Sequence, residues 1–254
     1  MQGQRTTGLQ EGGALEDRGD QREHLRRRDR GLRRLGTAVR LALILCAALA
    51  LAGCPSNATY LRPELQAAAN QRDAMALSDA LEKLIDEQQA TDEDREAAYE
   101  AVKRLEEDTA EYAFARAALA GRLAQVRGLT AIGLVAEAEK YARLSRKLDP
   151  DFRDRAAQRM LGTLYVMAPA ALVEHGDSET GLELLEELVD ERPDRIENRL
   201  RLAEGYVVLD DPEPAFEHLC WCLERKSTLR PDAQRLLAQV VEDAGGVAEL
   251  GCQD

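Results

Sequence analysis

A recurring spacing of glycine, small residue and proline constrains the fold more than any other feature of this sequence. The intervals are five and twelve residues in two successive segments, Gly133–Ala138–Pro150 and Gly176–Gly181–Pro193. Asp210 and Ala215 begin a third segment with the first interval, but no proline follows at the expected place. Small residues let paired helices approach closely, and proline ends helices. The pattern predicts an all-α fold, an α-solenoid of antiparallel helix pairs.

The amino-acid usage of residues 61–246 agrees with this prediction. Alanine, leucine, glutamate and arginine dominate, aromatic residues are few, and no strand-like alternation of apolar and polar residues occurs. We therefore predict a helical domain over residues 61–246 and a tail at residues 247–254. Residues that favour helix starts occur at Ser78-Asp79, Thr91, Asp151 and Pro231.

Matching positions in the helix pairs predict which residues form the repeat contacts. Gly162 and Tyr165 share a Leu-Gly/Ala-x-x-Tyr pattern with Ala203 and Tyr206. These spacings resemble those of tetratricopeptide repeats. The residues predicted to pack between helices are Ala138, Gly162, Tyr165, Gly181, Leu185, Ala203, Tyr206 and Ala215.

The middle repeat carries an apolar insertion, Val166–His175, which Pro169 interrupts. Insertions in repeat proteins lie on one face, often the binding face. An apolar segment is also costly to expose unless it packs on something or contacts a ligand. We therefore predict a ligand or partner surface made of Met167, Pro169, Leu172, Val173 and His175.

The sequence Leu51-Ala-Gly-Cys54 has the form of a bacterial lipobox. It ends an apolar run from Leu41, and Arg33, Arg34 and Arg40 precede that run. The run is too short for a membrane-spanning helix, which needs about 20 residues. We predict a lipoprotein signal peptide at residues 32–53. An ordinary cleaved signal and a cytosolic helix are the alternatives.

This signal predicts cleavage between Gly53 and Cys54 and lipidation of Cys54. Residues 1–31 make the leader longer than a secretory signal, so we interpret them as a disordered or mis-annotated leader. Residues 54–60 would form a tether. The domain would lie at the periplasmic face of the cell envelope, with the outer membrane favoured because no acidic residue follows Cys54 directly.

Without residues 1–53 the chain keeps 24 basic and 41 acidic residues, a net charge of about −17. This charge argues against nucleic acid as a partner, because phosphate binding needs a basic face. Three cysteines would remain. We favour unpaired thiols over a Cys220–Cys252 disulfide that leaves Cys222 as a buried thiol.

The sequence offers no recognisable catalytic or metal-binding motif. It lacks a nucleophile elbow, a zinc-protease helix motif and a phosphate-binding glycine loop. His175 and His218 are the two histidines after Cys54, and neither has ligand spacing. We predict no enzymatic activity, no cofactor and no metal.

Three segments carry a family resemblance: Ala156–Pro169, His175–Leu188 and Asn198–Tyr206, with Pro193 between the last two. Together they resemble TatT-type lipoproteins, the T components associated with tripartite ATP-independent periplasmic (TRAP) transporters. The resemblance implies a periplasmic, oligomeric scaffold that docks a substrate-binding protein and can pass an apolar ligand through a central opening. Gly181 departs from the alanine that repeats favour, and the third repeat lacks its proline.

The sequence thus predicts a lipid-anchored periplasmic scaffold that serves a TRAP-type transporter. Its expected partners are the membrane, through the lipid, a substrate-binding protein, an apolar small ligand and other copies of the chain. The alternative is an envelope assembly lipoprotein, a protein–protein adaptor without a small-molecule site.

Overall fold

The computed structural model describes residues 61–252 of the 254-residue chain. The predictions for the leader at 1–31, the signal peptide at 32–53, the cleavage site and lipidation at Gly53 and Cys54, and the tether at 54–60 lie outside the described residues. Within residues 61–252, the structure does not describe the side chain at position 129.

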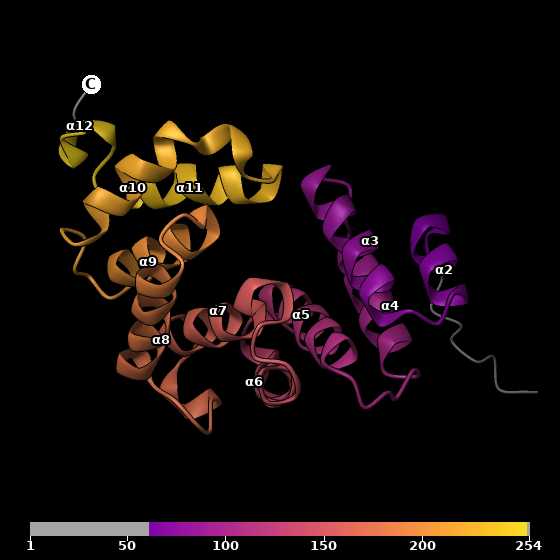
Figure 1. The fold of residues 1–254 in the computed structure, drawn as a ribbon. Coiled ribbons are helices and arrows are strands. Elements are labelled where there is room, and N and C mark those ends of the chain that lie inside the picture. Colours follow the sequence, from indigo (N-terminus) through magenta and orange to yellow (C-terminus); the bar gives the residue numbers. More distant parts are fainter. Residues whose placement is uncertain (1–60, 253–254) are drawn as a thin grey trace, which may run out of the picture. The chain divides into compact units, whose positions relative to one another are not determined.

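The described residues are all-α, as predicted, with three short 3₁₀ turns between some of the helices (Figure 1). None of these helices is both long and apolar enough to span a membrane. The α-helices are α2 (Pro63–Asn70), α3 (Ala74–Asp86), α4 (Asp92–Val102), α5 (Ala110–Arg127), α6 (Ile132–Leu148), α7 (Phe152–Met167), α8 (Ser178–Glu191), α9 (Ile196–Val208), α10 (Ala215–Glu224), α11 (Pro231–Asp243) and α12 (Val247–Leu250).

The predicted helix pairs are present. The helix α5 packs on α6, α7 packs on α8, and α9 packs on α10, so each pair corresponds to one of the repeat segments. The stacking of these pairs as a regular solenoid stays a prediction. The predicted tail contains one more short helix, α12, which packs on α10.

Five helices from successive parts of the chain also contact one another in a closed order. The helix α3 contacts α5, α5 contacts α7, α7 contacts α9, α9 contacts α11, and α11 returns to contact α3. We call these five helices the helix ring. The ring joins the first part of the described chain to the last (Figure 1).

Charged side chains hold α11 against α3. Arg230, just before α11, binds Glu82 at 2.7 Å and Asp86 at 2.9 Å. The backbone N–H of Asp232 donates to Asp86 Oδ1 at 3.0 Å. Arg122 on α5 contacts both Glu82, at 2.7 Å, and Asp232, at 3.0 Å. The ring therefore closes through ion pairs rather than through an apolar seam.

The two largest apolar clusters lie in different parts of the described chain. The first is built mainly on α2 to α5, with fully buried leucines such as Leu77 and Leu81. The second is built on α9 to α12 around Leu219 and Cys222. Burial of such side chains supplies most of the stability of each part.

The helix starts partly follow the predicted signals. Thr91 caps α4 with a reciprocal capping box, and Pro231 is at the first position of α11. Asp151 precedes α7 but makes no capping hydrogen bond. The predicted start at Ser78-Asp79 is wrong, because Asp73 caps this helix five residues earlier by accepting from the N–H of Ala76.

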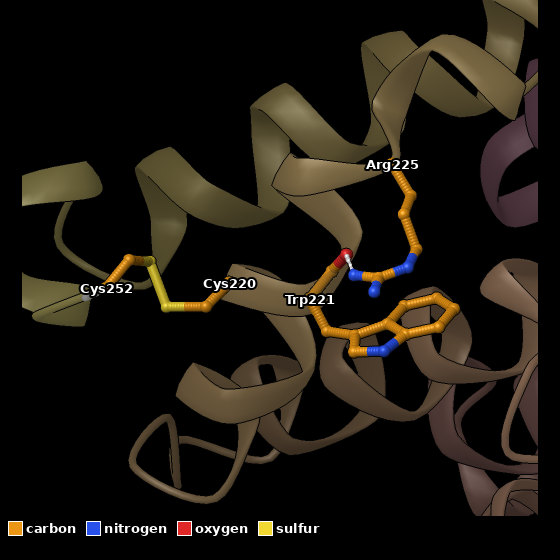
Figure 2. The surroundings of a disulfide bond; sticks show 4 residues. All are labelled: Cys220, Trp221, Arg225 and Cys252. Carbon is orange, nitrogen blue, oxygen red and sulfur yellow. Dashed lines mark hydrogen bonds between the residues drawn. A yellow bond between two sulfur atoms is a disulfide. The ribbon is translucent and has the colours of Figure 1, made fainter. Parts of the chain in front are cut away.

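A disulfide joins Cys220 on α10 to Cys252 after α12, and Cys222 is a buried free thiol (Figure 2). The favoured prediction of three unpaired thiols is therefore wrong. The short helix α12 brings Cys252 back to α10, which the sequence spacing of 32 residues did not indicate. Beside the disulfide, Arg225 lies over the Trp221 ring at 4.1 Å from its centroid (Figure 2).

Candidate functional site

The insertion predicted as a binding surface forms the connection between α7 and α8. Pro169 is preceded by Ala168 in an extended conformation, with φ −86° and ψ 141°. A residue before proline disfavours helical backbone, so α7 ends at Met167. The chain then makes one 3₁₀ turn at Ala170–Leu172 and returns to α8 at Asp177, which caps that helix.

A buried carboxylate on α6 fixes this connection in place. The side chain of Glu139 is only 3% exposed. It accepts hydrogen bonds from the backbone N–H groups of Glu174 and His175, each at 2.8 Å, and from the Tyr165 hydroxyl at 3.0 Å. The His175 ring contributes its Nδ1 at 3.3 Å. One side chain thus ties α6, α7 and the insertion together.

These hydrogen bonds also set the charge of Glu139. Burial alone would raise its pKa, but the donors from Glu174, Tyr165 and His175 outweigh burial and hold the pKa below its ordinary value. Burial and the neighbouring carboxylate raise the pKa of Tyr165, which stays a neutral donor. The group that holds the insertion is therefore an ionised carboxylate at neutral pH.

Gly176 completes this anchor by giving Tyr165 room. A Cβ on Gly176 would lie 2.5 Å from the Tyr165 ring, closer than real side chains approach. The Leu-Gly/Ala-x-x-Tyr pattern of the sequence therefore leads to a specific contact, in which the tyrosine lies under the end of the insertion and reaches Glu139.

The insertion and α6 enclose a groove with a cavity of about 740 Å³. Its apolar part includes Ile132, Leu172 and Val173, and Ile132 is 58% exposed. Its charged part comes from α5, α6 and the end of the insertion. The lining charged residues are Arg116, Glu137, Glu139, Lys140, Arg143 and Glu174, and His175 lies beside them. We call this the insertion groove. It presents apolar side chains next to charges of both signs.

The charged wall of the groove is itself ordered. The guanidinium of Arg116 binds Glu137 at 2.6 Å and lies over the Tyr141 ring at 4.5 Å from its centroid. The hydroxyl of Tyr99 on α4 donates to the other oxygen of Glu137 at 2.7 Å. This wall holds its side chains in fixed positions before any ligand arrives.

The structure brings together three of the five residues predicted for the ligand or partner surface. Leu172, Val173 and His175 line the insertion groove. Met167 and Pro169 do not line it, although Met167 is 48% exposed and Pro169 is also exposed. These two residues lie at the end of α7, where the chain leaves the helix before it reaches the groove.

The residues predicted to pack between repeats lie inside or beside the helix pairs. Gly162 on α7 and Gly181 on α8 contact each other, and a Cβ on Gly181 would lie 2.8 Å from the Gly162 carbonyl oxygen. Tyr206 is half-buried and donates to Glu186 at 2.7 Å. The buried members are Ala138, Gly162, Tyr165, Gly181, Leu185, Ala203 and Ala215.

Sequence reasoning missed Glu139, on which the groove depends. A signal for it does exist. Val135, Ala138, Glu139 and Ala142 follow the i, i+3, i+4, i+7 spacing of the buried stripe of α6. A glutamate in such a stripe is rarely buried without partners, so its position indicates a polar network inside the domain.

The groove's side chains are suited to binding by apolar contact and ion pairing. Within residues 61–252, no three histidine, cysteine, aspartate or glutamate side chains gather in an arrangement for a metal ion. The other histidine after Cys54, His218, does not line the groove and stacks on the Tyr206 ring. Burial, together with the charge of Arg199, lowers the pKa of His218.

A scan of the chain against models of known protein families gives no match, and a comparison with curated proteins gives no match either. The role of the insertion groove is therefore inferred from its own residues and from the sequence motifs around it.

Proposed function

We propose that this chain is a lipid-anchored, periplasmic helical-repeat scaffold that serves a TRAP-type solute transporter by docking its substrate-binding protein. The observation that carries this proposal is the insertion groove. The insertion that forms it interrupts the repeat pattern, yet the buried Glu139 fixes the insertion to α6 through three contacts and binds Tyr165 on α7 through a fourth. An ordered, open groove on a helical-repeat domain is a recurrent way to bind a protein partner.

The disulfide between Cys220 and Cys252 supports the export that the lipobox predicts. Disulfides persist in oxidising compartments such as the bacterial periplasm and are rare in the cytosol. The lipobox and the disulfide are far apart in the sequence and have separate physical causes, so they support the same location independently.

The composition of the groove supports a protein as its main occupant. Ile132, Leu172 and Val173 offer an apolar contact, and Lys140 and Arg143 offer charges beside it. Protein interfaces combine an apolar centre with a polar rim in this way. The apolar part alone would serve an apolar small ligand, which the TatT resemblance implies.

Co-purification from the native envelope tests this function. The full chain should recover a periplasmic substrate-binding protein, and Leu172→Glu should lose it because a charge would enter the apolar part of the groove. Val208→Glu is the matched control, since Val208 is 47% exposed and does not line the groove. Equal recovery by both variants, or recovery of no substrate-binding protein, would overturn the proposal.

Cell fractionation tests the anchor separately. Cys54→Ser should leave the chain unprocessed or release it from the membrane, because the acyl chains need the thiol. Unchanged fractionation and an unchanged mass would contradict the lipid anchor while leaving the docking experiment intact.

The second candidate function is an envelope assembly lipoprotein that gathers proteins and binds no small molecule. The charged wall of the groove, Arg116 with Glu137, favours it over a purely apolar pocket. Native mass spectrometry distinguishes the two functions. A bound apolar molecule supports the transporter component, and an empty protein that recovers only cell-wall or outer-membrane proteins supports the assembly role.

A further inference from the structure

A second cavity, of about 140 Å³, lies where four helices of the helix ring approach one another. Its lining comes from α5, α7, α9 and the start of α11, which are far apart in the sequence. The lining residues are Arg122, Arg159, Glu197, Leu200, Arg201, Arg230, Asp232 and Ala233. Four of these eight residues are arginines, although the chain as a whole is strongly acidic.

Three of the four arginines pair with carboxylates: Arg122, Arg230 and Arg201, whose partner is Glu204. Arg122 binds Glu82 through two hydrogen bonds of 2.7 Å and reaches Asp232 at 3.0 Å. Arg230 binds Glu82 and Asp86. The guanidiniums of Arg122 and Arg230 hold the ring closed, and their charges are already matched by nearby carboxylates.

Arg159 differs from these three. Within residues 61–252, no carboxylate oxygen comes within 4.0 Å of its guanidinium, and only its Nη1 donates hydrogen bonds. The acceptors are neutral: the Asn198 side-chain oxygen at 2.8 Å and the Asp154 carbonyl at 3.4 Å. Burial lowers the pKa of Arg159, and it outweighs the nearby carboxylate of Glu197, which raises the pKa.

Asn198 shows that the position of Arg159 is built into the fold. The Asn198 side chain is fully buried, and its Nδ2 donates to the Leu188 carbonyl at 3.2 Å. The Asn198 amide oxygen then accepts the hydrogen bond from Arg159 Nη1. An asparagine fixes the guanidinium without neutralising it, whereas an aspartate at the same position would form an ion pair.

Arg201 supplies a second set of donors. Its Nη1 binds Glu204 at 2.7 Å, and within the described residues its other guanidinium nitrogens make no hydrogen bond. The carboxylate of Glu197 also lines the cavity, and it forms no ion pair in the described part of the chain. The cavity thus contains donors on two arginines and two carboxylates, of which Asp232 pairs with Arg122 and Glu197 forms no ion pair in the described residues.

We propose that this cavity is a binding site for a small oxyanion, a phosphate or the carboxylate end of a small organic acid, with Arg159 as its central ligand and Arg201 as the second. Guanidinium groups match the geometry of carboxylate and phosphate oxygens and bind them through paired N–H donors. A volume of about 140 Å³ equals the share of roughly four or five water molecules, enough for such a group. This site is independent of the proposed function.

Isothermal titration calorimetry of the full chain at low ionic strength tests the site, with inorganic phosphate, sulfate and succinate as separate probes. We expect saturable binding of one oxyanion per chain. Phosphate and sulfate without succinate would assign a tetrahedral anion, and succinate alone would assign a carboxylate.

Three variants assign the binding to this cavity. Arg159→Gln should weaken binding about tenfold or more, since a charged hydrogen-bond donor pair is lost. Glu197→Gln should tighten it by about twofold to tenfold, because a repelling charge is removed. Arg72→Gln is the control for charge, because Arg72 is exposed at the turn before α3. It should leave the affinity unchanged.

The higher affinity expected of Glu197→Gln separates binding from folding, because a poorly folded variant would not bind the anion more tightly. The site would be overturned by the absence of saturable binding for all three probes, by equal effects of Arg159→Gln and Arg72→Gln, or by a Glu197→Gln variant that binds no better than the unchanged chain.

Discussion

Gly162 on α7 and Gly181 on α8 meet at a distance that admits no side chain, since a Cβ on Gly181 would lie 2.8 Å from the Gly162 carbonyl oxygen. Repeat proteins usually place an alanine at the second of these positions, and this close contact gives the physical reason for the glycine. The neighbouring atom is backbone, which cannot move aside as a flexible side chain would.

Gly181→Ala should therefore destabilise the domain by about 1–3 kcal/mol through overpacking. Urea denaturation measures the change. Gly121→Ala on α5 is the matched control, because a Cβ at that position would have nothing within 4 Å, and alanine favours helix over glycine by about 0.5–1 kcal/mol. A Gly181→Ala variant as stable as Gly121→Ala would contradict the close packing of α7 on α8.

Glu139→Gln should loosen the insertion without unfolding the helices. The amide keeps one acceptor oxygen and turns its NH₂ group toward a backbone N–H, so the buried site loses about 1–3 kcal/mol. Hydrogen exchange at the amides of Glu174 and His175 should become faster. Glu174→Gln is the control, because its side chain is 85% exposed while its backbone N–H still reaches Glu139. Equal exchange in the two variants would contradict the anchor.

The contact between α3 and α11 should weaken in acid. Burial alone would raise the pKa of Glu82, but Arg122 and Arg230 outweigh it and hold the pKa below the ordinary 4.5. A carboxyl with a lowered pKa stabilises the fold fully above its unfolded pKa, and the stabilisation is lost as the pH falls through the folded value.

Glu82→Gln should therefore cost about 2–3 kcal/mol at pH 7, and this difference from the unchanged chain should shrink below about pH 4. Asp79→Asn, on the same helix, should cost at most about 1 kcal/mol, because its pair with Arg153 is exposed. Denaturant titrations at pH 3 and pH 7 measure both variants. A difference that stays constant with pH would exclude ionised Glu82 as its source.

Reduction of the Cys220–Cys252 disulfide should destabilise the C-terminal helices. The bond closes a segment with a sequence separation of 32, for which the chain-entropy account gives about 3–4 kcal/mol. Thermal unfolding with and without a phosphine reductant measures the effect. A Cys220→Ser, Cys252→Ser double variant should be insensitive to the reductant, and equal sensitivity would assign the effect to another group.

Local patterns in the sequence were sufficient to predict the all-α class and the helix pairs, although not every helix start. The close helix contact at Gly162 and Gly181 and the helix end near Pro193 could be predicted, because close approach and helix termination involve only one or two neighbouring helices. The all-α class was predicted correctly for the same reason. Residues of the insertion could be identified because they break a regular spacing, and three of the five predicted residues, Leu172, Val173 and His175, lie together.

Local patterns could not predict contacts between distant parts of the chain. Arg230 and Glu82 are separated by 148 residues, and no spacing rule joins them. Glu139 was not predicted, because the sequence contains many glutamates and only its place in the buried stripe of α6 distinguishes it. The pairing of Cys220 with Cys252 needed the position of α12, which sequence spacing does not supply.

The return of α11 to α3 has a consequence for how this protein can vary in length. An open row of repeats presents a free face at each end, so duplication of one unit adds a layer and leaves the others undisturbed. Here the last ring helix already occupies the place beside the first, through Arg230 and Glu82. An added helix pair would have to break that junction. Closure therefore limits the number of helix pairs that this part of the chain can hold.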